Sequence, residues 1–274
     1  HPMVSKVAFA GGVDTARQIV ASTALNLAPV SLELGGKSPI LVFDDADLDG
    51  AVNGAIAGNF GASGQSCVAG SRVLVQAGMH DRFISELVER AEAIRIGDPL
   101  DDDSQMGPLA TRAQRDRIEA VVVESIAQGA VLHTGGARPE GLDAGWYYRP
   151  TVLGCANQDV ACTRIELFGP VMSVLSFETE ADGVAMANDT EFGLAAGIFS
   201  SDASRVHRVA RSVRAGIVWV NTYRAISPVA PFGGFGNSGS GREAGVDAIG
   251  EFTRTKTVWI NTSEQPMANP FTIR

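Results

Sequence analysis

The chain has 274 residues and a formal net charge of −9, with 45% hydrophobic and 19% charged residues. This length is sufficient for one large α/β domain or for one and a half smaller ones. The acidic balance argues against nucleic acid or an anionic membrane as the main partner, and no apolar run reaches the length of a membrane span.

The cysteine and histidine residues indicate a reducing environment and no metal centre. The three cysteines, Cys67, Cys155 and Cys162, form no CxxC pair, which indicates free thiols and a cytoplasmic protein. The four histidines are scattered along the chain without the spacing of metal ligands, so we expect no metal site.

The chain opens on a strand–turn–helix unit. A strand is predicted over residues 7–9, a glycine turn at Gly11-Gly12 and an alanine-rich helix over residues 14–26. Because the chain starts at His1, one turn before this unit, we expect it to be the later part of a longer protein whose N-terminal portion is missing.

The remaining chain alternates strands with helices, two of which are predicted to be capped by Asp47 and Asp81. This alternation favours an α/β fold, a three-layer and mostly parallel sheet with helices on both faces. Strands are predicted over residues 39–43, 72–76, 130–133, 147–153, 171–177, 196–200 and 217–221, and helices after the two caps and over residues 111–128, 180–188 and 204–215. A last strand at 255–261 alternates as an exposed edge strand does.

Cys67 is the first candidate for chemistry. It lies in the run Gly64-Gln-Ser-Cys67, among small residues in a loop between a predicted helix and a predicted strand. Small neighbours allow a substrate and backbone amides to come close, and loops on a rigid scaffold often carry function. A buried and inert packing cysteine is the alternative.

Two carboxylates are further candidates. Glu33 stands between two leucines before a Gly-Gly turn, where burial would raise its pKa toward that of a general base; an ordinary ion pair with Lys37 is the alternative. Glu166 and Phe168 precede a predicted strand, and in an extended segment they would point to the same side, toward a ribose and a flat ring. A salt-bridged strand start with a core phenylalanine is the alternative.

The glycine-rich stretch at 231–243 excludes regular structure and lacks the spacing of a phosphate-binding P-loop. Together with the segments around Glu33, Cys67 and Glu166 it resembles the aldehyde dehydrogenase superfamily. The motifs Glu-Leu-Gly-Gly-Lys, Gly-Gln-Ser-Cys and Glu-Leu-Phe-Gly-Pro occur in the family's order, with 34 residues between glutamate and cysteine (67 − 33 = 34). The resemblance covers essentially the whole chain.

The resemblance implies an enzyme that oxidises an aldehyde to a carboxylic acid with NAD or NADP. Cys67 would be the nucleophile that forms a thiohemiacetal and then a thioester, and Glu33 would activate the hydrolytic water. The cofactor-binding positions implied by the family are Gly11, Gly12, Leu34, Glu166 and Phe168. The family's division implies the tail of a dinucleotide-binding domain in residues 1–33, a catalytic domain in 34–233, and a C-terminal return with an oligomerisation strand in 234–274.

Two departures from the family pattern stand out. The cofactor turn reads Phe-Ala-Gly-Gly with Ala16 in place of the second glycine, and the family's oxyanion asparagine has no counterpart in this sequence. Arg224 lies where the family builds its substrate tunnel and could pair with a distal carboxylate; a surface arginine is the alternative.

Two other functions are considered beside the dehydrogenase. The chain could be a truncated catalytic and oligomerisation module without turnover of its own. A cysteine hydrolase would need a histidine base, and His80 is the nearest in sequence to Cys67. For the intact protein we expect a small aldehyde substrate and a homo-oligomer, dimer or tetramer, joined through the strand at 255–261.

Overall fold

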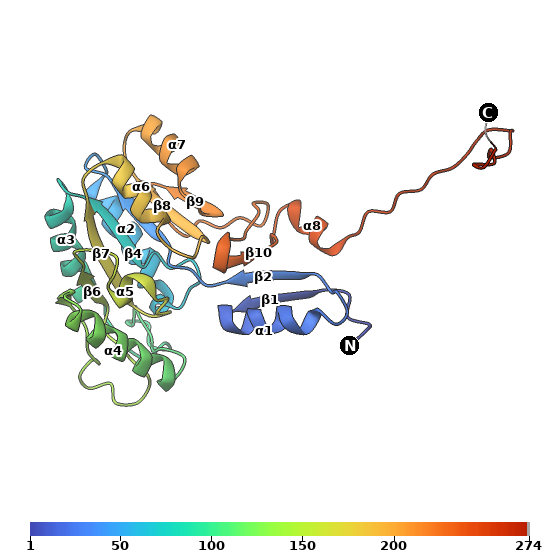
Figure 1. Cartoon of the computed structure of the whole chain (residues 1–274). Coiled ribbons are helices and arrows are strands. Elements are labelled where there is room, and N and C mark those ends of the chain that lie inside the picture. The colour runs from blue at the N-terminus through green and yellow to red at the C-terminus, as the bar shows by residue number, and fades with distance from the viewer. Residues whose placement is uncertain (273–274) are drawn as a thin grey trace.

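The computed structural model of the chain describes residues 1–272, and its strands form two separate sheets (Figure 1). The large sheet has seven strands, in which only the β5–β6 pair is antiparallel. Their spatial order is β5 (Val131–Thr134), β6 (Thr151–Gly154), β7 (Val171–Phe177), β4 (Arg72–Gln76), β3 (Pro39–Val42), β8 (Ala195–Phe199) and β9 (Ile217–Val220).

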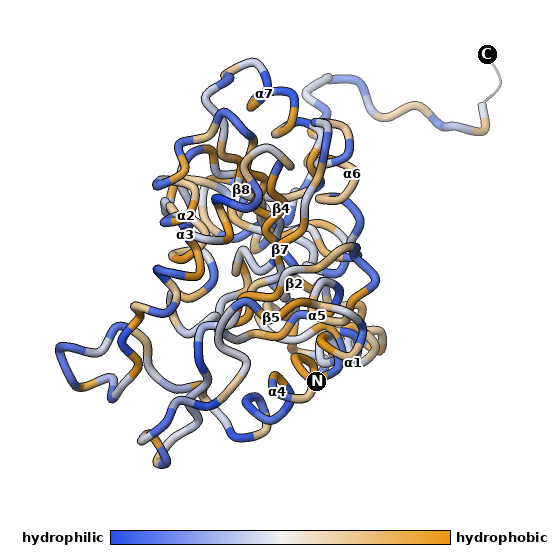
Figure 2. Tube along the Cα trace, turned by 90° about the vertical axis from the view of Figure 1, so that its left-hand side faces the viewer, coloured by the Kyte–Doolittle hydropathy of each residue, from blue (hydrophilic) through white to orange (hydrophobic). Residues whose placement is uncertain are grey.

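Helices cover both faces of the large sheet. Ile40 and Val42 on β3 pack with α2 (Leu48–Asn59) and α3 (His80–Glu92). Leu41 and Phe43 point the other way, into a second core. This second core contains residues of α4 (Arg112–Ala127), α5 (Ala161–Arg164), α6 (Glu180–Asn188) and α7 (Ala203–Ser212). The predicted three-layer α/β architecture is confirmed, and in Figure 2 the apolar segments gather in central strands such as β4 and β7.

The small sheet is built from both ends of the chain. β1 (Val7–Gly11) pairs in parallel with β2 (Val30–Leu34), and β10 (Gly239–Ser240) pairs antiparallel with β2. α1 (Val13–Thr23) packs beside β1 and β2 (Figure 1). The first and third predicted regions thus share one sheet, and the predicted boundary at 33/34 falls inside β2.

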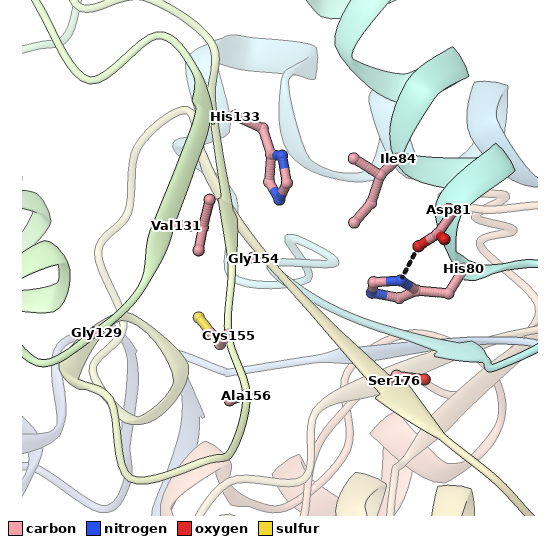
Figure 3. Close-up of a pocket in the computed structure, with 10 residues that line it drawn as sticks. All are labelled: His80, Asp81, Ile84, Gly129, Val131, His133, Gly154, Cys155, Ala156 and Ser176. Carbon is pink, nitrogen blue, oxygen red and sulfur yellow. Dashed lines mark hydrogen bonds and ion pairs between the residues drawn. The ribbon is translucent and has the colours of Figure 1, made fainter.

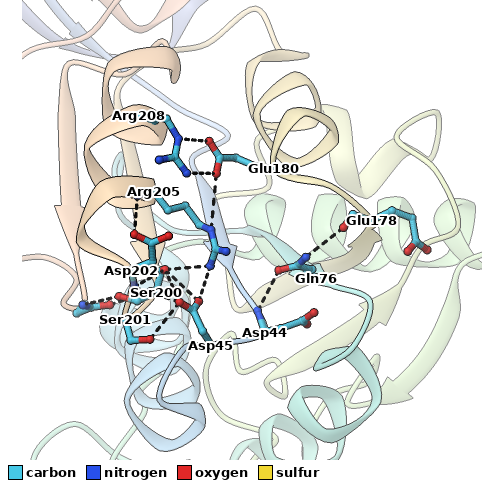
Figure 4. Close-up of polar contacts among 11 residues, drawn as sticks. Asp44, Asp45, Gln76, Glu178, Glu180, Ser200, Ser201, Asp202, Arg205 and Arg208 are labelled. Atoms are coloured by element: carbon cyan, nitrogen blue, oxygen red, sulfur yellow. Dashed lines mark hydrogen bonds and ion pairs between the residues drawn. The ribbon is translucent and has the colours of Figure 1, made fainter.

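Polar side chains tie together the carboxyl ends of the central strands (Figure 4). Asp45, just after β3, accepts hydrogen bonds from the hydroxyls of Ser200 and Ser201, just after β8. It also forms an ion pair with Arg205 on α7 at 2.7 Å. Gln76 bridges the loop after β3 and the loop after β7 through the backbone of Asp44 and Glu178. These contacts fix the loops at the carboxyl ends of β3, β8, β4 and β7 relative to one another.

Several predicted element boundaries are wrong. The strand expected from residue 147 begins at Thr151, and α3 is capped by Met79, so Asp81 lies inside the helix. Asp47 and Thr111 do cap their helices, each side chain accepting a bond from the backbone three residues later.

The C-terminal segment also differs from its prediction. No strand forms at 255–261, because no strand of residues 1–272 lies beside this segment to pair with it. A short helix, α8 (Asp247–Phe252), precedes an extended arm that leaves the body of the molecule (Figure 1). Among residues 1–272 no helix combines the length and apolar composition needed to cross a bilayer.

Candidate active site

The predicted site residues converge at the amino ends of the large sheet's strands. The segment after Glu33 leads into β3, Cys67 precedes β4, and Glu166 precedes β7. His80 follows β4 at its other end, which removes it as a base for Cys67 and with it the cysteine hydrolase.

Glycines allow these three segments to touch. A Cβ on Gly36 would lie 2.8 Å from the backbone oxygen of Cys67, and a Cβ on Gly64 would overlap the carbonyl group of Gly169. Gly64 has a φ of 72°, in the left-handed region, and it follows Ala62 and Ser63 in the same conformation with φ of 53° and 54°. The short helix η1 (Gly61–Gly64) therefore makes an unusual turn that brings the Cys67 loop against the Glu166 segment.

The thiol of Cys67 is partly exposed and held neutral by its surroundings. Burial raises its pKa, backbone N–H groups of Val68 and Cys67 lower it, and the charges of Glu166 and Glu33 raise it again. The backbone amides thus face the sulfur, while both carboxylates are close enough to act on it. Such a thiol needs a base or a bound cation to become a nucleophile.

Glu33 is 8% exposed, and neither of its carboxylate oxygens has a hydrogen-bond partner among residues 1–272. Burial and the charge of Glu243 raise its pKa to about 7, against the opposing charge of Arg242. The alternative of an ion pair with Lys37 is wrong, because the buried Lys37 Nζ donates to Ser71 Oγ at 3.0 Å. A buried carboxyl group that titrates near neutrality has the properties of a general base.

Glu166 is hydrogen-bonded to the Gly35–Gly36 turn that follows Glu33. Its Oε1 accepts a hydrogen bond of 3.0 Å from the backbone N–H of Gly36. Phe168 is 39% exposed and has a φ of 51°, so the backbone is not extended there and the predicted same-side arrangement with Glu166 is wrong. Phe168 is two residues after Glu166 in the chain, and its carbonyl oxygen accepts a hydrogen bond of 3.3 Å from Gln114 Nε2.

A cavity of about 760 Å³ lies between the N-terminus of α1 and Glu166. Gly12 begins this helix without a side-chain cap, so the first-turn amides face the cavity. Three arginines from three different segments, Arg17, Arg117 and Arg164, also line it. A neighbouring cavity of about 300 Å³ is lined by Leu34 and Ala16. Asp14 and Glu191 line the cavity as well, and Arg17 and Arg164 are ion-paired with Asp14 and Asp189. The uncapped amides of the helix fit a diphosphate, and the Glu166 carboxylate fits the hydroxyls of a ribose.

Gly11 ends β1 one residue before this cavity, with the ring of Phe9 packed over it. Ala16, which stands where the family has its second glycine, is 2% exposed, so its methyl group is buried in the packing of α1.

Arg224 lies beside α2 and η1. Its Nη1 donates to the carbonyl oxygen of Ala57 at 3.2 Å and would lie 2.6 Å from a Cβ on Gly61. The preceding Tyr223 is buried, and its hydroxyl donates to the carbonyl oxygen of Val68 at 2.9 Å. Arg224 thus lies at the junction of α2 and η1, and its nearest contact there, Gly61, is six residues before Cys67 (67 − 61 = 6).

Sequence reasoning missed the surroundings of Glu33. The glycine-rich stretch brings Arg242 and Glu243 to this carboxylate, and a Cβ on Gly233 would lie 2.8 Å from Glu33 Oε1. The clustered glycines were the only signal of this contact, and they indicate close packing without naming the partner.

The chain is similar to known proteins over its whole length. It is 52% identical over 275 residues to the (Z)-2-((N-methylformamido)methylene)-5-hydroxybutyrolactone dehydrogenase of Acinetobacter baylyi, covering 100% of this chain and 56% of that protein. It is 47% identical to the betaine aldehyde dehydrogenase of Brucella anthropi, covering 95% of this chain and 54% of that protein.

Among solved structures, the chain resembles the betaine aldehyde dehydrogenase of Staphylococcus aureus in complex with NAD⁺, with 38% identity and a TM-score of 0.96. This match covers 99% of the chain and 54% of the S. aureus protein. The chain spans about half the length of the curated relatives it matches. The sequence profile described as "Aldehyde dehydrogenase family" matches residues 1–258. The resemblance found in the sequence is confirmed, and the chain belongs to the aldehyde dehydrogenase family.

Proposed function

We propose that this chain carries the catalytic machinery of an NAD(P)-dependent aldehyde dehydrogenase, with Cys67 as nucleophile and Glu33 as general base. The observation that supports this most strongly is the buried Glu33 carboxylate, which has no hydrogen-bond partner among residues 1–272 and a pKa of about 7. Its charge also raises the pKa of the Cys67 thiol, so the two groups are close to each other. A structural role would leave both carboxylate oxygens hydrogen-bonded.

After its thiol proton has passed to a base, Cys67 attacks the aldehyde carbon through its sulfur and forms a thiohemiacetal. The backbone N–H groups near the sulfur would bind the oxyanion that develops at the adjacent carbon. Loss of the hydride from that carbon leaves a thioester. Glu33 then takes a proton from a water molecule, which attacks the thioester carbon, and the carboxylic acid leaves as the bond to the Cys67 sulfur breaks.

The cofactor, when bound, accepts the hydride of the aldehyde. Residues of the 760 Å³ cavity would hold it: Gly12 and the first turn of α1 toward the diphosphate and Glu166 toward a ribose. Gly11 and Leu34 border this region, and Phe168 stands two residues from Glu166. The cavity has cations for either NAD or NADP, so the choice between them is open.

The second candidate is a catalytic and oligomerisation module that does not turn over aldehydes by itself. It is favoured by the coverage of about half of the relatives' length. Isothermal titration of the chain with NAD and with NADP separates the two, because micromolar binding would contradict the second candidate.

A cofactor-independent test addresses the site directly. An activated ester such as p-nitrophenyl acetate acylates a cysteine without hydride transfer, so the 274-residue chain can be assayed as it is. We expect a burst of p-nitrophenol followed by slow turnover. Cys67→Ala should abolish the burst, whereas Glu33→Gln should keep it and slow the later phase about 100-fold or more. A burst that survives Cys67→Ala would refute the assignment of the nucleophile.

For the aldehyde itself we propose a small substrate, and Arg224, at the junction of α2 and η1, is the candidate for recognising a distal carboxylate. Arg224→Ala in the longer protein should then lower the preference for carboxylated over plain aldehydes, and an unchanged ratio of kcat/KM values would contradict this role.

A further inference from the structure

The two cysteines that the proposed mechanism does not use lie together inside the large domain. The sulfur atoms of Cys155 and Cys162 are 3.6 Å apart, and both residues are buried. Their backbones are fixed on different elements: Cys155 follows β6 and donates its N–H to Val174 of β7, while Cys162 lies in α5 and donates its N–H to Ser125 Oγ on α4. Each cysteine is thus held by a backbone hydrogen bond to a neighbouring element, and these bonds fix the contact between the two sulfur atoms.

A buried cation stands close to this pair. Lys37 is 1% exposed, and the charges of Cys162 and Cys155 both act on its ammonium group. Lys37 keeps a pKa of about 8 in spite of its burial, so it is largely protonated at pH 7. Either thiol can donate the hydrogen bond between the two sulfurs; this contact and the Lys37 charge lower the pKa of Cys162, against burial, which raises it. Two thiols in contact beside a cation are a more reactive arrangement than an isolated packing cysteine.

One member of the pair, Cys155, can be reached through a pocket. Cys155 lines a pocket of about 450 Å³ whose wall also includes His80, His133 and Ser176 (Figure 3). The pocket lies between α3 and the β5–β6 pair. His80 and Ser176 place it at the carboxyl ends of β4 and β7, whereas Cys67 precedes β4 at the amino ends. A small neutral oxidant that enters this pocket meets Cys155, and the sulfur of Cys162 lies 3.6 Å behind it.

We propose that Cys155 and Cys162 form a site of reversible oxidation, which hydrogen peroxide or a small organic hydroperoxide converts from a dithiol to a disulfide. One sulfur attacks the O–O bond, becomes a sulfenic acid and releases water or an alcohol; the other sulfur then displaces hydroxide, and the two thiol protons leave in the products. With hydrogen peroxide, two thiols and one peroxide give one disulfide and two waters. The sulfurs must approach from 3.6 Å to about 2.05 Å, which the side-chain torsions can supply.

Oxidation at this pair is separable from chemistry at Cys67 by peptide mapping. Trypsin does not cleave Arg138–Pro139 or Arg149–Pro150, so Cys155 and Cys162 share the peptide 118–164, whereas Cys67 falls in 38–72. The 274-residue chain is treated with graded hydrogen peroxide, alkylated under denaturing conditions and digested. Peptide 118–164 is expected to lose two hydrogens, to become at least about fivefold less alkylated, and to recover after dithiothreitol.

The single variants Cys155→Ser and Cys162→Ser provide the controls. Neither should show the loss of two hydrogens in peptide 118–164, and circular dichroism reports whether each is folded. The wild-type measurement decides without them. The proposal is overturned if peptide 118–164 stays fully alkylated at peroxide doses that oxidise Cys67 in the same sample, or if its cysteines gain oxygen singly and do not join.

Discussion

Gly64 lies directly against Gly169, where a Cβ on Gly64 would overlap the carbonyl carbon and oxygen of Gly169. In Gly64→Ala the new Cβ would overlap Gly169, and alanine would have to adopt the left-handed conformation at φ 72° that glycine adopts without strain. We expect a loss of about 2–4 kcal/mol in the free energy of unfolding. Urea denaturation measures it, with Gly12→Ala as the matched control, because a Cβ there meets nothing within 4 Å. Equal stability of the two variants would contradict the packing described for the Cys67 loop.

Glu33 makes the stability of the fold depend on pH. Its folded pKa is raised from 4.5 to about 7, so the folded state binds the proton more tightly than the unfolded state does. The stability that this provides at low pH is lost as pH rises from about 4.5 through 7, by up to about 3 kcal/mol. Glu33→Gln should therefore raise the unfolding free energy above pH 8 and change it little at pH 5.

The comparison is made by urea denaturation at both pH values. Glu178→Gln is the control, because Glu178 is exposed at the end of β7 and its replacement should shift neither value. A Glu33→Gln variant with the same gain at pH 5 and pH 8 would show that its effect comes from packing and not from the charge.

Arg72 is a buried cation held by acceptors from three segments. It is 0% exposed, and its guanidinium donates to the backbone oxygens of Lys37, Met186 and Ala187 and to the Gln158 side chain, at 2.8–2.9 Å. Arg72→Met would leave these acceptors without a donor, at a cost of about 3–5 kcal/mol in unfolding free energy. Arg138→Met removes an ion-paired arginine whose side chain is 52% exposed and should cost no more than about 1 kcal/mol. Similar losses in both variants would refute this role for Arg72.

The C-terminal arm exposes apolar residues that suit contact with another subunit. Trp259 is 93% exposed, and its neighbours Val258 and Ile260 are 68% and 78% exposed. If the arm mediates the proposed self-association, Trp259→Ala should weaken it about 30-fold in sedimentation velocity. Leu100→Ala is the matched control, since Leu100 is also 93% exposed but lies in a loop. The measurement is made on the longer protein, and a wild-type protein that sediments there as a monomer at high concentration would contradict the proposal.

The sequence predicts the fold where the signal is local. The apolar run at 39–43, the cap at Asp47 and the start of the helix predicted from residue 111 fall where the structure has them, because periodicity and capping depend on neighbours in the chain. The segment at 255–261 has the alternation of a strand, but a strand also needs a partner, and alternation cannot supply one.

The site follows the same division. Its residue types and their order could be predicted, and the structure brings Glu33, Glu166 and the Cys67 loop to one edge. The environment of each group could not be predicted, since Lys37 turns away to Ser71 and Arg242 arrives from more than 200 residues along the chain (242 − 33 = 209). A pKa is set by such distant neighbours, and sequence spacing carries no information about them.

The proposed base, Glu33, and the proposed nucleophile, Cys67, belong to segments of different sheets. Glu33 belongs to β2 of the small sheet, whereas Cys67 leads into β4 of the large one, and the Gly35–Gly36 turn joins them under the clasp of Glu166. The separation between carboxylate and sulfur is therefore not a property of either sheet alone. If the proposed roles hold, a ligand that hydrogen-bonds to Glu166 competes with the Gly36 N–H for the same carboxylate, and the turn between the two sheets is then the place where cofactor binding and hydrolysis meet.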